Sequence, residues 1–210
     1  MARRTKEDAL VTRDLILDAA ERVFLRRGVS RTSLQEIAME ASLTRGAIYW
    51  HFQNKADVFD AMMQRVTLPM VARLNSQARA VPDDPLQHLR QSVASAFHQT
   101  VHDQQVRRVF EIASHMVEYG DDLQTVRDNH IYERSERVND LERLLLQARA
   151  NGLLPAHLTS RAAAVGLHAL LDGLMSNWLL EPEAFDLEVV GLQALNAYLA
   201  GLGQPATESL

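Results

Sequence analysis

Apolar residues recur every three or four positions along almost the whole chain, and this spacing limits the possible folds more than any other feature of the sequence. Such a period places the apolar side chains on one face of an α-helix. β-branched residues rarely alternate with polar ones, so the pattern of half-buried strands is rare. We therefore expect an all-α protein.

Start and stop signals delimit the first helices. The first helix is expected to end at Gly28, because glycine commonly follows the last turn of a helix. Two overlapping capping boxes, Thr32 with Gln35 and Ser33 with Glu36, predict that a short second helix begins there.

The remaining helix starts are marked in the same way. Thr44 caps a third helix that is interrupted at residues 52–54, and Asn54 with Asp57 caps a fourth that runs towards Pro82. Further helices are expected over residues 85–103, 104–119, 122–150, 159–180 and 186–201. These lengths predict a three-helix helix-turn-helix domain over residues 1–55 and a larger helical domain over residues 56–210, connected by the fourth helix from residue 54.

Composition excludes several classes of protein. The 210 residues include no cysteine, so there is no disulfide framework, thiolate metal site or cysteine nucleophile. Hydrophobic residues make up 47% and charged residues 23%, which is a globular balance. We expect a cytoplasmic protein, since no uninterrupted apolar run reaches the roughly 18 residues of a membrane span and the N-terminus does not resemble a signal peptide.

Charge is divided unevenly along the chain. The net charge is −5, but residues 1–55 hold ten Lys and Arg against seven Asp and Glu, so this end is positive and the remainder is negative. A basic end joined to an acidic body indicates that the basic end meets a polyanion.

Residues 32–55 have the layout of a helix-turn-helix, in which a second short helix enters the major groove of DNA. On that second helix Ile48 and Phe52 are spaced to face inward. The outward positions are then Arg45, Gly46, Ala47, Tyr49 and Trp50.

These side chains suit contacts with DNA. Arg45 can bond to guanine O6 and N7, and Gly46 permits close approach. Tyr49, His51 and Lys55 can donate to phosphates. The expected contact set also includes the residues that open the two helices, Thr32, Ser33 and Thr44, of which Thr32 and Ser33 would hold a further phosphate.

Taken singly, these residues have other interpretations. Many helical hairpins look like a helix-turn-helix, and an exposed aromatic such as Trp50 more often packs against protein. His51 alone is more often a structural hydrogen bonder.

The whole run decides between these interpretations. Residues 32–38 and 44–55 read TSLQEIA and TRGAIYWHFQNK, and this pattern resembles the DNA-binding signature of the TetR family of bacterial repressors. The opening RRTKE and the run RGAIYWHF resemble the AcrR, TtgR and MtrR branch, which represses multidrug efflux pump operons. Thinner likeness continues to Trp178-Leu179.

The resemblance implies a transcriptional repressor with an N-terminal DNA-binding domain and a C-terminal domain for ligand binding and dimerisation. It implies a homodimer through the eighth and ninth helices, a pseudo-palindromic operator in double-stranded DNA, and release from DNA by a small apolar or aromatic inducer. In the ninth helix, we expect an apolar stripe that includes Leu192 and Leu195 to face the partner subunit. No cofactor or membrane partner is expected.

An inducer pocket is expected in the larger domain. Apolar and sulfur-containing side chains suit an adaptable pocket, with a few polar groups to orient the ligand. The expected lining is Val66, Met70, Val93, Phe97, Phe110, Ala113, Ser114, Leu141, His168, Leu171, Asp172 and Met175.

The sequence also allows other functions. A regulator of another operon that responds to a different metabolite is the first alternative. An enzyme would use His168 with Asp172, one helical turn apart, but no nucleophile is tied to them by a motif, so we expect no catalytic site. His98 and His102 have the spacing of metal ligands, but histidines on a solvated helix face usually bind no metal, so no metal site is predicted.

Overall fold

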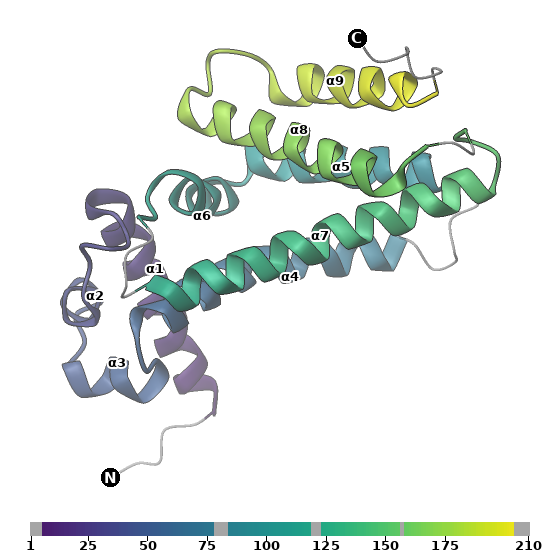
Figure 1. The fold of residues 1–210 in the computed structure, drawn as a ribbon. Helices are drawn as coiled ribbons and strands as arrows, with labels where there is room; N and C mark the ends of the chain where they lie inside the picture. The colour runs from purple at the N-terminus through teal and green to yellow at the C-terminus, as the bar shows by residue number, and fades with distance from the viewer. Residues whose placement is uncertain (1–5, 78–83, 119–122, 156–157, 204–210) are drawn as a thin grey trace. The chain divides into compact units, whose positions relative to one another are not determined.

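The computed structural model describes residues 6–77, 84–118, 123–155 and 158–203, with the side chains of residue 6 and residues 71–77 left aside. Figure 1 shows that the described residues form helices. Their bounds are α1 (Lys6–Arg27), α2 (Leu34–Glu40), α3 (Arg45–His51), α4 (Lys55–Gln77), α5 (Pro85–His102), α6 (Gln104–His115), α7 (Gln124–Ala150), α8 (Ser160–Leu180) and α9 (Leu187–Gly201). The all-α expectation is confirmed.

The chain divides into two compact units. The first contains residues 1–69 and 105–129, and the second contains residues 70–104 and 130–210. The first unit therefore includes α6 and parts of α4 and α7 in addition to α1–α3. It is larger than the domain of residues 1–55 that the helix lengths predict.

A buried carboxylate ties together three helices of the first unit. Glu21 of α1 is only 1% exposed. Its Oε1 accepts hydrogen bonds from Arg65 of α4 and from Gln105 of α6, and its Oε2 accepts one from Arg108 of α6 at 3.3 Å. Arg65 also pairs with Asp18 at 2.8 Å. Because a buried carboxylate is unfavourable without partners, this network fixes α4 and α6 against α1.

The loop after α1 is held by the end of α6. Gly28 has φ 79°, in the left-handed region that glycine adopts without strain. The backbone N–H of Val29 then donates to the Met116 carbonyl at 2.8 Å, and the Ser30 hydroxyl donates to the Glu118 carbonyl. α6 ends at His115, earlier than the expected residue 119, and the carbonyls that hold this loop belong to residues just after the helix.

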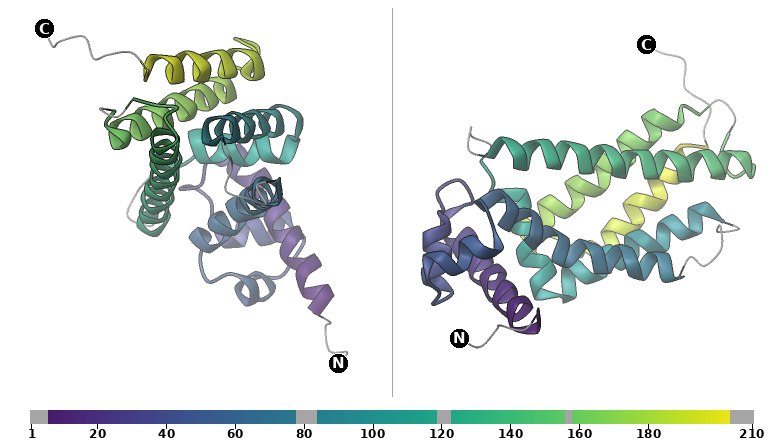
Figure 2. Two further views of the ribbon diagram at one scale, coloured as in Figure 1. Left: turned by 90° about the vertical axis from the view of Figure 1, so that its right-hand side faces the viewer. Right: turned by 90° about the horizontal axis from the view of Figure 1, so that it is seen from below.

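In the second unit, α5 and α8 both pack against α9, and the views in Figures 1 and 2 show α8 and α9 side by side. The closest approaches occur at glycines. The ring of Phe97 occupies the space that a Cβ at Gly191 would need, and the Tyr198 hydroxyl does the same at Gly166. That hydroxyl donates to the Ala163 carbonyl at 2.8 Å.

α8 differs from the other helices in composition. Among the described residues, it is the one helix long and apolar enough to cross a membrane, although its most apolar window is only 28% buried. The helix is not an uninterrupted apolar run, because Arg161, His168 and Asp172 lie within it. Much of this apolar surface is therefore exposed in the single subunit.

The Glu21 network yields a stability prediction. Replacing Glu21 by alanine leaves two arginines without their shared buried partner, so we expect the free energy of unfolding to fall by about 3–5 kcal/mol. Urea denaturation followed by circular dichroism measures this change. Glu7→Ala, at an exposed position of the same helix, is the control and should change stability by less than about 0.5 kcal/mol. Equal effects of the two substitutions would show that the network contributes nothing.

Candidate DNA-binding site and ligand-binding residues

The start of α2 is fixed by a capping box. The Glu36 backbone N–H donates to the Ser33 hydroxyl, and the Ser33 backbone N–H donates to the Glu36 carboxylate at 2.8 Å. Of the two overlapping boxes that the sequence offers, this one forms. The pKa of Glu36 is lowered, chiefly because the carboxylate accepts the hydrogen bond from the Ser33 backbone and a second from the Ser33 hydroxyl.

The turn between α2 and α3 is tight. Ser42 has φ 55°, an uncommon backbone conformation for a residue other than glycine. The N–H of Ser42 donates to the Met39 carbonyl and that of Leu43 to the Ala38 carbonyl, which is the pattern of a Schellman motif. The turn therefore ends α2 sharply, and Thr44 caps α3 by accepting from the Ala47 N–H at 3.2 Å.

α3 presents one buried and one exposed face. Ile48 is fully buried, and Phe52, the residue that ends the helix, is 4% exposed, so both face inward as expected. On the other face, Trp50 is 72% exposed and Tyr49 is 47% exposed. The guanidinium of Arg45 lies 5.3 Å from the centre of the Tyr49 ring. An exposed arginine is thus held in place by a neighbour one turn along the same helix.

Charged pairs hold α2 against α1. Glu40 accepts hydrogen bonds from Arg22 and Arg26, and Glu36 pairs with Arg27. The hydrogen bonds from Arg26 and Arg22 lower the pKa of Glu40 to about 2. Glu40 therefore stays ionised at neutral pH, and the pairs fix the orientation of the helix that precedes α3.

Not every residue expected at the DNA is equally accessible. Gly46 is exposed, as are Ser33 and Thr44, while Ala47 and His51 are half-buried. Thr32 does not fit the expected phosphate contact, because its side chain is 4% exposed and its hydroxyl donates to the Gly28 carbonyl. Lys55 is half-buried, and its ammonium donates to the Ser30 carbonyl at 2.6 Å.

The residues expected to bind an inducer are divided between the two units. Val66, Phe110, Ala113 and Ser114 belong to the first unit. Met70, Val93, Phe97, Leu141, His168, Leu171, Asp172 and Met175 belong to the second. The expectation that they line one pocket remains a prediction.

Within the second unit, several of these side chains have defined surroundings. Phe97 is buried against Gly191 of α9, and Met175 of α8 lies 4.0 Å from the hydroxyl of the buried Thr100 of α5. The Nε2 atom of His168 is buried and has no hydrogen-bond partner among the described residues. A buried nitrogen without a partner is costly, so this histidine is suited to bond with a ligand.

A groove of about 540 Å³ lies elsewhere, along the second half of α8 and the loop that follows it. Ala169, Leu170, Gly173 and Phe185 are among the residues that line it. Of the residues expected to bind an inducer, none lines this groove.

Comparison with known proteins identifies the family. A model described as bacterial regulatory proteins of the tetR family matches residues 16–62, and one described as the C-terminal region of MAATS-type transcriptional repressors matches residues 84–203. The chain belongs to the TetR family of transcriptional regulators. It is 42% identical over 193 residues to the regulator TtgR of Pseudomonas putida, and the match covers 89% of each chain.

Solved structures of TetR-family proteins have the same fold. NalD, the secondary repressor of the MexAB-OprM multidrug efflux pump in Pseudomonas aeruginosa, has a TM-score of 0.85 and 35% identity over 95% of this chain and 99% of its own. SmeT in complex with triclosan has a TM-score of 0.80 and 33% identity over 95% and 98% of the two chains. SmeT is the repressor of the Stenotrophomonas maltophilia multidrug efflux pump SmeDEF.

Family membership agrees with the expectation that the chain is not an enzyme. The structure is also at odds with a His168 and Asp172 pair joined through Nε2, because that atom has no hydrogen-bond partner in the described part of the chain. Asp172 instead interacts electrostatically with His130 of α7. The pKa of His130 is lowered, mainly by burial, while Asp172 acts to raise it.

Sequence reasoning missed residues whose partners are distant in the chain. Glu21 reads as one of several acidic positions on an amphipathic helix, and its burial depends on residues 44 and 84 positions later. Glu188 was likewise not paired with His98 and His102, which it contacts from α9.

Proposed function

We propose that the chain represses a multidrug efflux pump operon, that α3 reads its operator, and that small apolar or aromatic compounds release it from DNA. The observation that carries the proposal is the exposed face of α3, where an arginine, a glycine and two aromatic residues lie together on a helix whose start is capped. An exposed tryptophan and tyrosine are unfavourable in water unless a partner covers them.

The exposed groups have complementary roles against DNA. Arg45 lies in the first turn of α3 and can reach O6 and N7 of a guanine in the major groove. Among the described residues, none lies within 4 Å of the Cβ position of Gly46, so base edges or sugars can approach closely. Tyr49 and Lys55, with His51 and the Ser33 hydroxyl, would bond to phosphates and set the register.

Control of an efflux operon rests on the relatives. NalD and SmeT, which share the fold at about one third sequence identity, are named as repressors of multidrug efflux pumps. If the inducer were itself a substrate of the pump, the pump would be expressed when a compound that it exports is present. A tenfold loss of operator affinity requires about 1.4 kcal/mol of difference in ligand binding between the two conformations.

The functional unit is proposed to be a homodimer formed through α8 and α9. Val165 is 49% exposed and Leu180 is 72% exposed on α8, and Val189 is 52% exposed on α9. These exposed apolar side chains, and the groove along α8 that includes Leu180, are features of the kind that a partner subunit covers. Leu195 does not belong to this surface: it is fully buried within the subunit, so its role is in the core.

An inducer site is proposed in the second unit around His168. The compound bound to SmeT, triclosan, is a chlorinated aromatic phenol, and a phenol can hydrogen-bond to an imidazole nitrogen. The buried Nε2 of His168 would supply that bond, while Leu171 and Met175 on the same helix would contact the rings.

The DNA-binding role of α3 is tested by comparing two substitutions. Arg45→Ala should weaken operator binding by about 1–3 kcal/mol and flatten the preference at one base pair per half-site, because a bidentate base contact is lost. Lys55→Ala should weaken all sequences alike and reduce the slope of log affinity against log salt by about one. Fluorescence anisotropy with operator and scrambled DNA measures both.

Arg143→Ala is the control for charge, since this arginine is exposed on α7. It should leave DNA binding unchanged. If Arg45→Ala lowered affinity equally for operator and scrambled DNA, Arg45 would be a phosphate contact and the base-reading role would be wrong.

The dimer surface is tested by placing a charge on it. Val165→Glu should give a folded monomer, because a carboxylate buried between two α8 helices is unfavourable. The monomer should no longer bind operator, because a single DNA-binding domain contacts only one half-site. Light scattering gives the mass and circular dichroism confirms folding. Ile131→Glu, at an exposed apolar position on α7, should remain dimeric. A wild-type chain that is monomeric at micromolar concentration would contradict the proposal.

The inducer site is tested at His168. Substitution by leucine removes a buried nitrogen that has no hydrogen-bond partner in the described part of the chain, so stability should be unchanged or raised. Affinity for triclosan should fall about tenfold, which corresponds to about 1.4 kcal/mol for one lost hydrogen bond. Isothermal titration calorimetry measures the affinity, and His115→Leu on α6 is the control. Equal triclosan affinity in wild type and His168→Leu would remove His168 from the site.

A further inference from the structure

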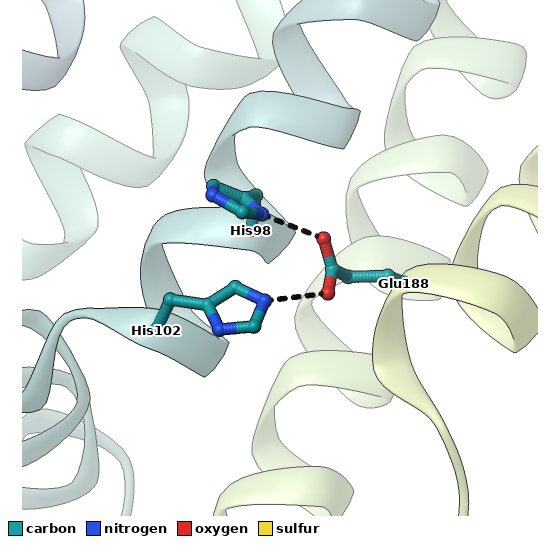
Figure 3. Close-up of side chains that lie close together, drawn as sticks. All are labelled: His98, His102 and Glu188. Carbon is teal, nitrogen blue, oxygen red and sulfur yellow. Dashed lines mark hydrogen bonds and ion pairs between the residues drawn. The ribbon is translucent and has the colours of Figure 1, made fainter.

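Three side chains that no part of the proposed function uses meet on the surface of the second unit. His98 and His102 lie one turn apart on α5, and Glu188 lies in the first turn of α9. Figure 3 shows both imidazoles directed at the two oxygens of the same carboxylate. His98 Nδ1 lies 2.8 Å from Oε1, and His102 Nε2 lies 2.9 Å from Oε2.

The packing of α5 on α9 holds these groups in register. The ring of Phe97, which precedes His98, fills the space beside Gly191, so the two helices approach more closely there than any side chain at position 191 would allow. Asp186 caps the start of α9 by accepting from the Val189 N–H at 3.0 Å. The backbone positions that carry all three groups are therefore fixed by buried or capped neighbours.

The donor set has the chemistry of a transition-metal site. Two imidazole nitrogens and a carboxylate oxygen suit Zn²⁺ and its neighbours, whereas Mg²⁺ and Ca²⁺ prefer oxygen ligands alone. One ligand atom from each residue can be chosen so that all three lie within 4.8 Å of one another. Zinc lies about 2.0–2.2 Å from each nitrogen or oxygen ligand, so rotation of exposed side chains is sufficient to enclose it.

We propose that His98, His102 and Glu188 bind a divalent transition-metal ion such as Zn²⁺, which would bridge α5 and α9. The two histidine side chains are 62% and 55% exposed, so an ion reaches them from solvent without opening the fold. Three protein ligands leave at least one coordination position for water. Such a site is labile, and its occupancy follows the concentration of the ion.

Besides that rotation of the side chains, binding requires a change of tautomer. A neutral imidazole that donates its proton to Glu188 can instead carry that proton on its other ring nitrogen, which frees the first nitrogen to bind the metal. Glu188 is the acidic member of the three ligands and supplies negative charge to the site.

Calorimetric titration of the full chain with ZnCl₂, without a polyhistidine tag and in a buffer that does not bind metals, tests the proposal. Wild type should bind one ion per subunit with micromolar affinity, and its thermal unfolding temperature should rise with zinc because the ion binds only the folded site. His98→Gln and His102→Gln should each weaken binding at least tenfold and abolish the thermal shift. Glu188→Gln should weaken binding while keeping its size.

His115→Gln, which removes an exposed histidine from α6, is the control and should bind zinc as wild type does. Circular dichroism confirms that the variants fold. Two results would overturn the proposal: zinc binding that survives the double substitution of His98 and His102, or the absence of zinc binding to wild type below millimolar concentration.

Discussion

The buried carboxylate of Glu21 is the constraint on which the first unit depends. A helix-turn-helix of two seven-residue helices cannot hold its shape alone, because so short a helix has little stability in water. Glu21 fixes α1 by bonding to Arg65 of α4 and Arg108 of α6, and α1 in turn holds α2 through exposed charged pairs. The orientation of α3 is therefore supported by side chains that lie outside α3. A buried carboxylate on α1 that needs partners from two other helices also favours this arrangement over packings that would leave it unsatisfied.

The helices and their caps could be predicted because their determinants lie close together in the sequence. Ser33 with Glu36, Thr44 with Ala47 and Asp186 with Val189 each join residues three positions apart. The inward placement of Ile48 and Phe52 followed from helical spacing in the same way. Interactions between distant segments gave no such signal. Whether Thr32 faces solvent or the loop carbonyl of Gly28 depends on the path of the chain after α1, and the partners of Glu21 are separated from it by dozens of residues.

The packing partners of small residues in the second unit could not be predicted from the sequence either. Glycines and alanines along α8 and α9 permit close helix contact, but the sequence does not reveal which contact lies within a subunit. Gly166 and Gly191 accommodate Tyr198 and Phe97 of the same chain. Gly173 instead borders a groove, and none of the described residues lies within 4 Å of its Cβ position. Leu195 was expected at the partner subunit and is instead in the core, because the face of α9 that packs on α5 and α8 includes it. The spacing of apolar residues identified the helix, but it did not show which of its residues pack within the subunit and which face a partner subunit.

Footprinting on the DNA upstream of the chain's own gene tests the central claim most directly, because it needs no assumption about which residues touch which bases. A dimeric TetR-family repressor should protect one pseudo-palindromic segment whose half-sites lie about one helical turn, or a multiple of it, apart. Protection should weaken steeply as salt rises from 50 to 200 mM, since phosphate contacts release counterions. The account predicts protection of that segment and the loss of this protection when an inducer such as triclosan is added. Uniform protection without a symmetric site, or none at any salt concentration, would contradict it.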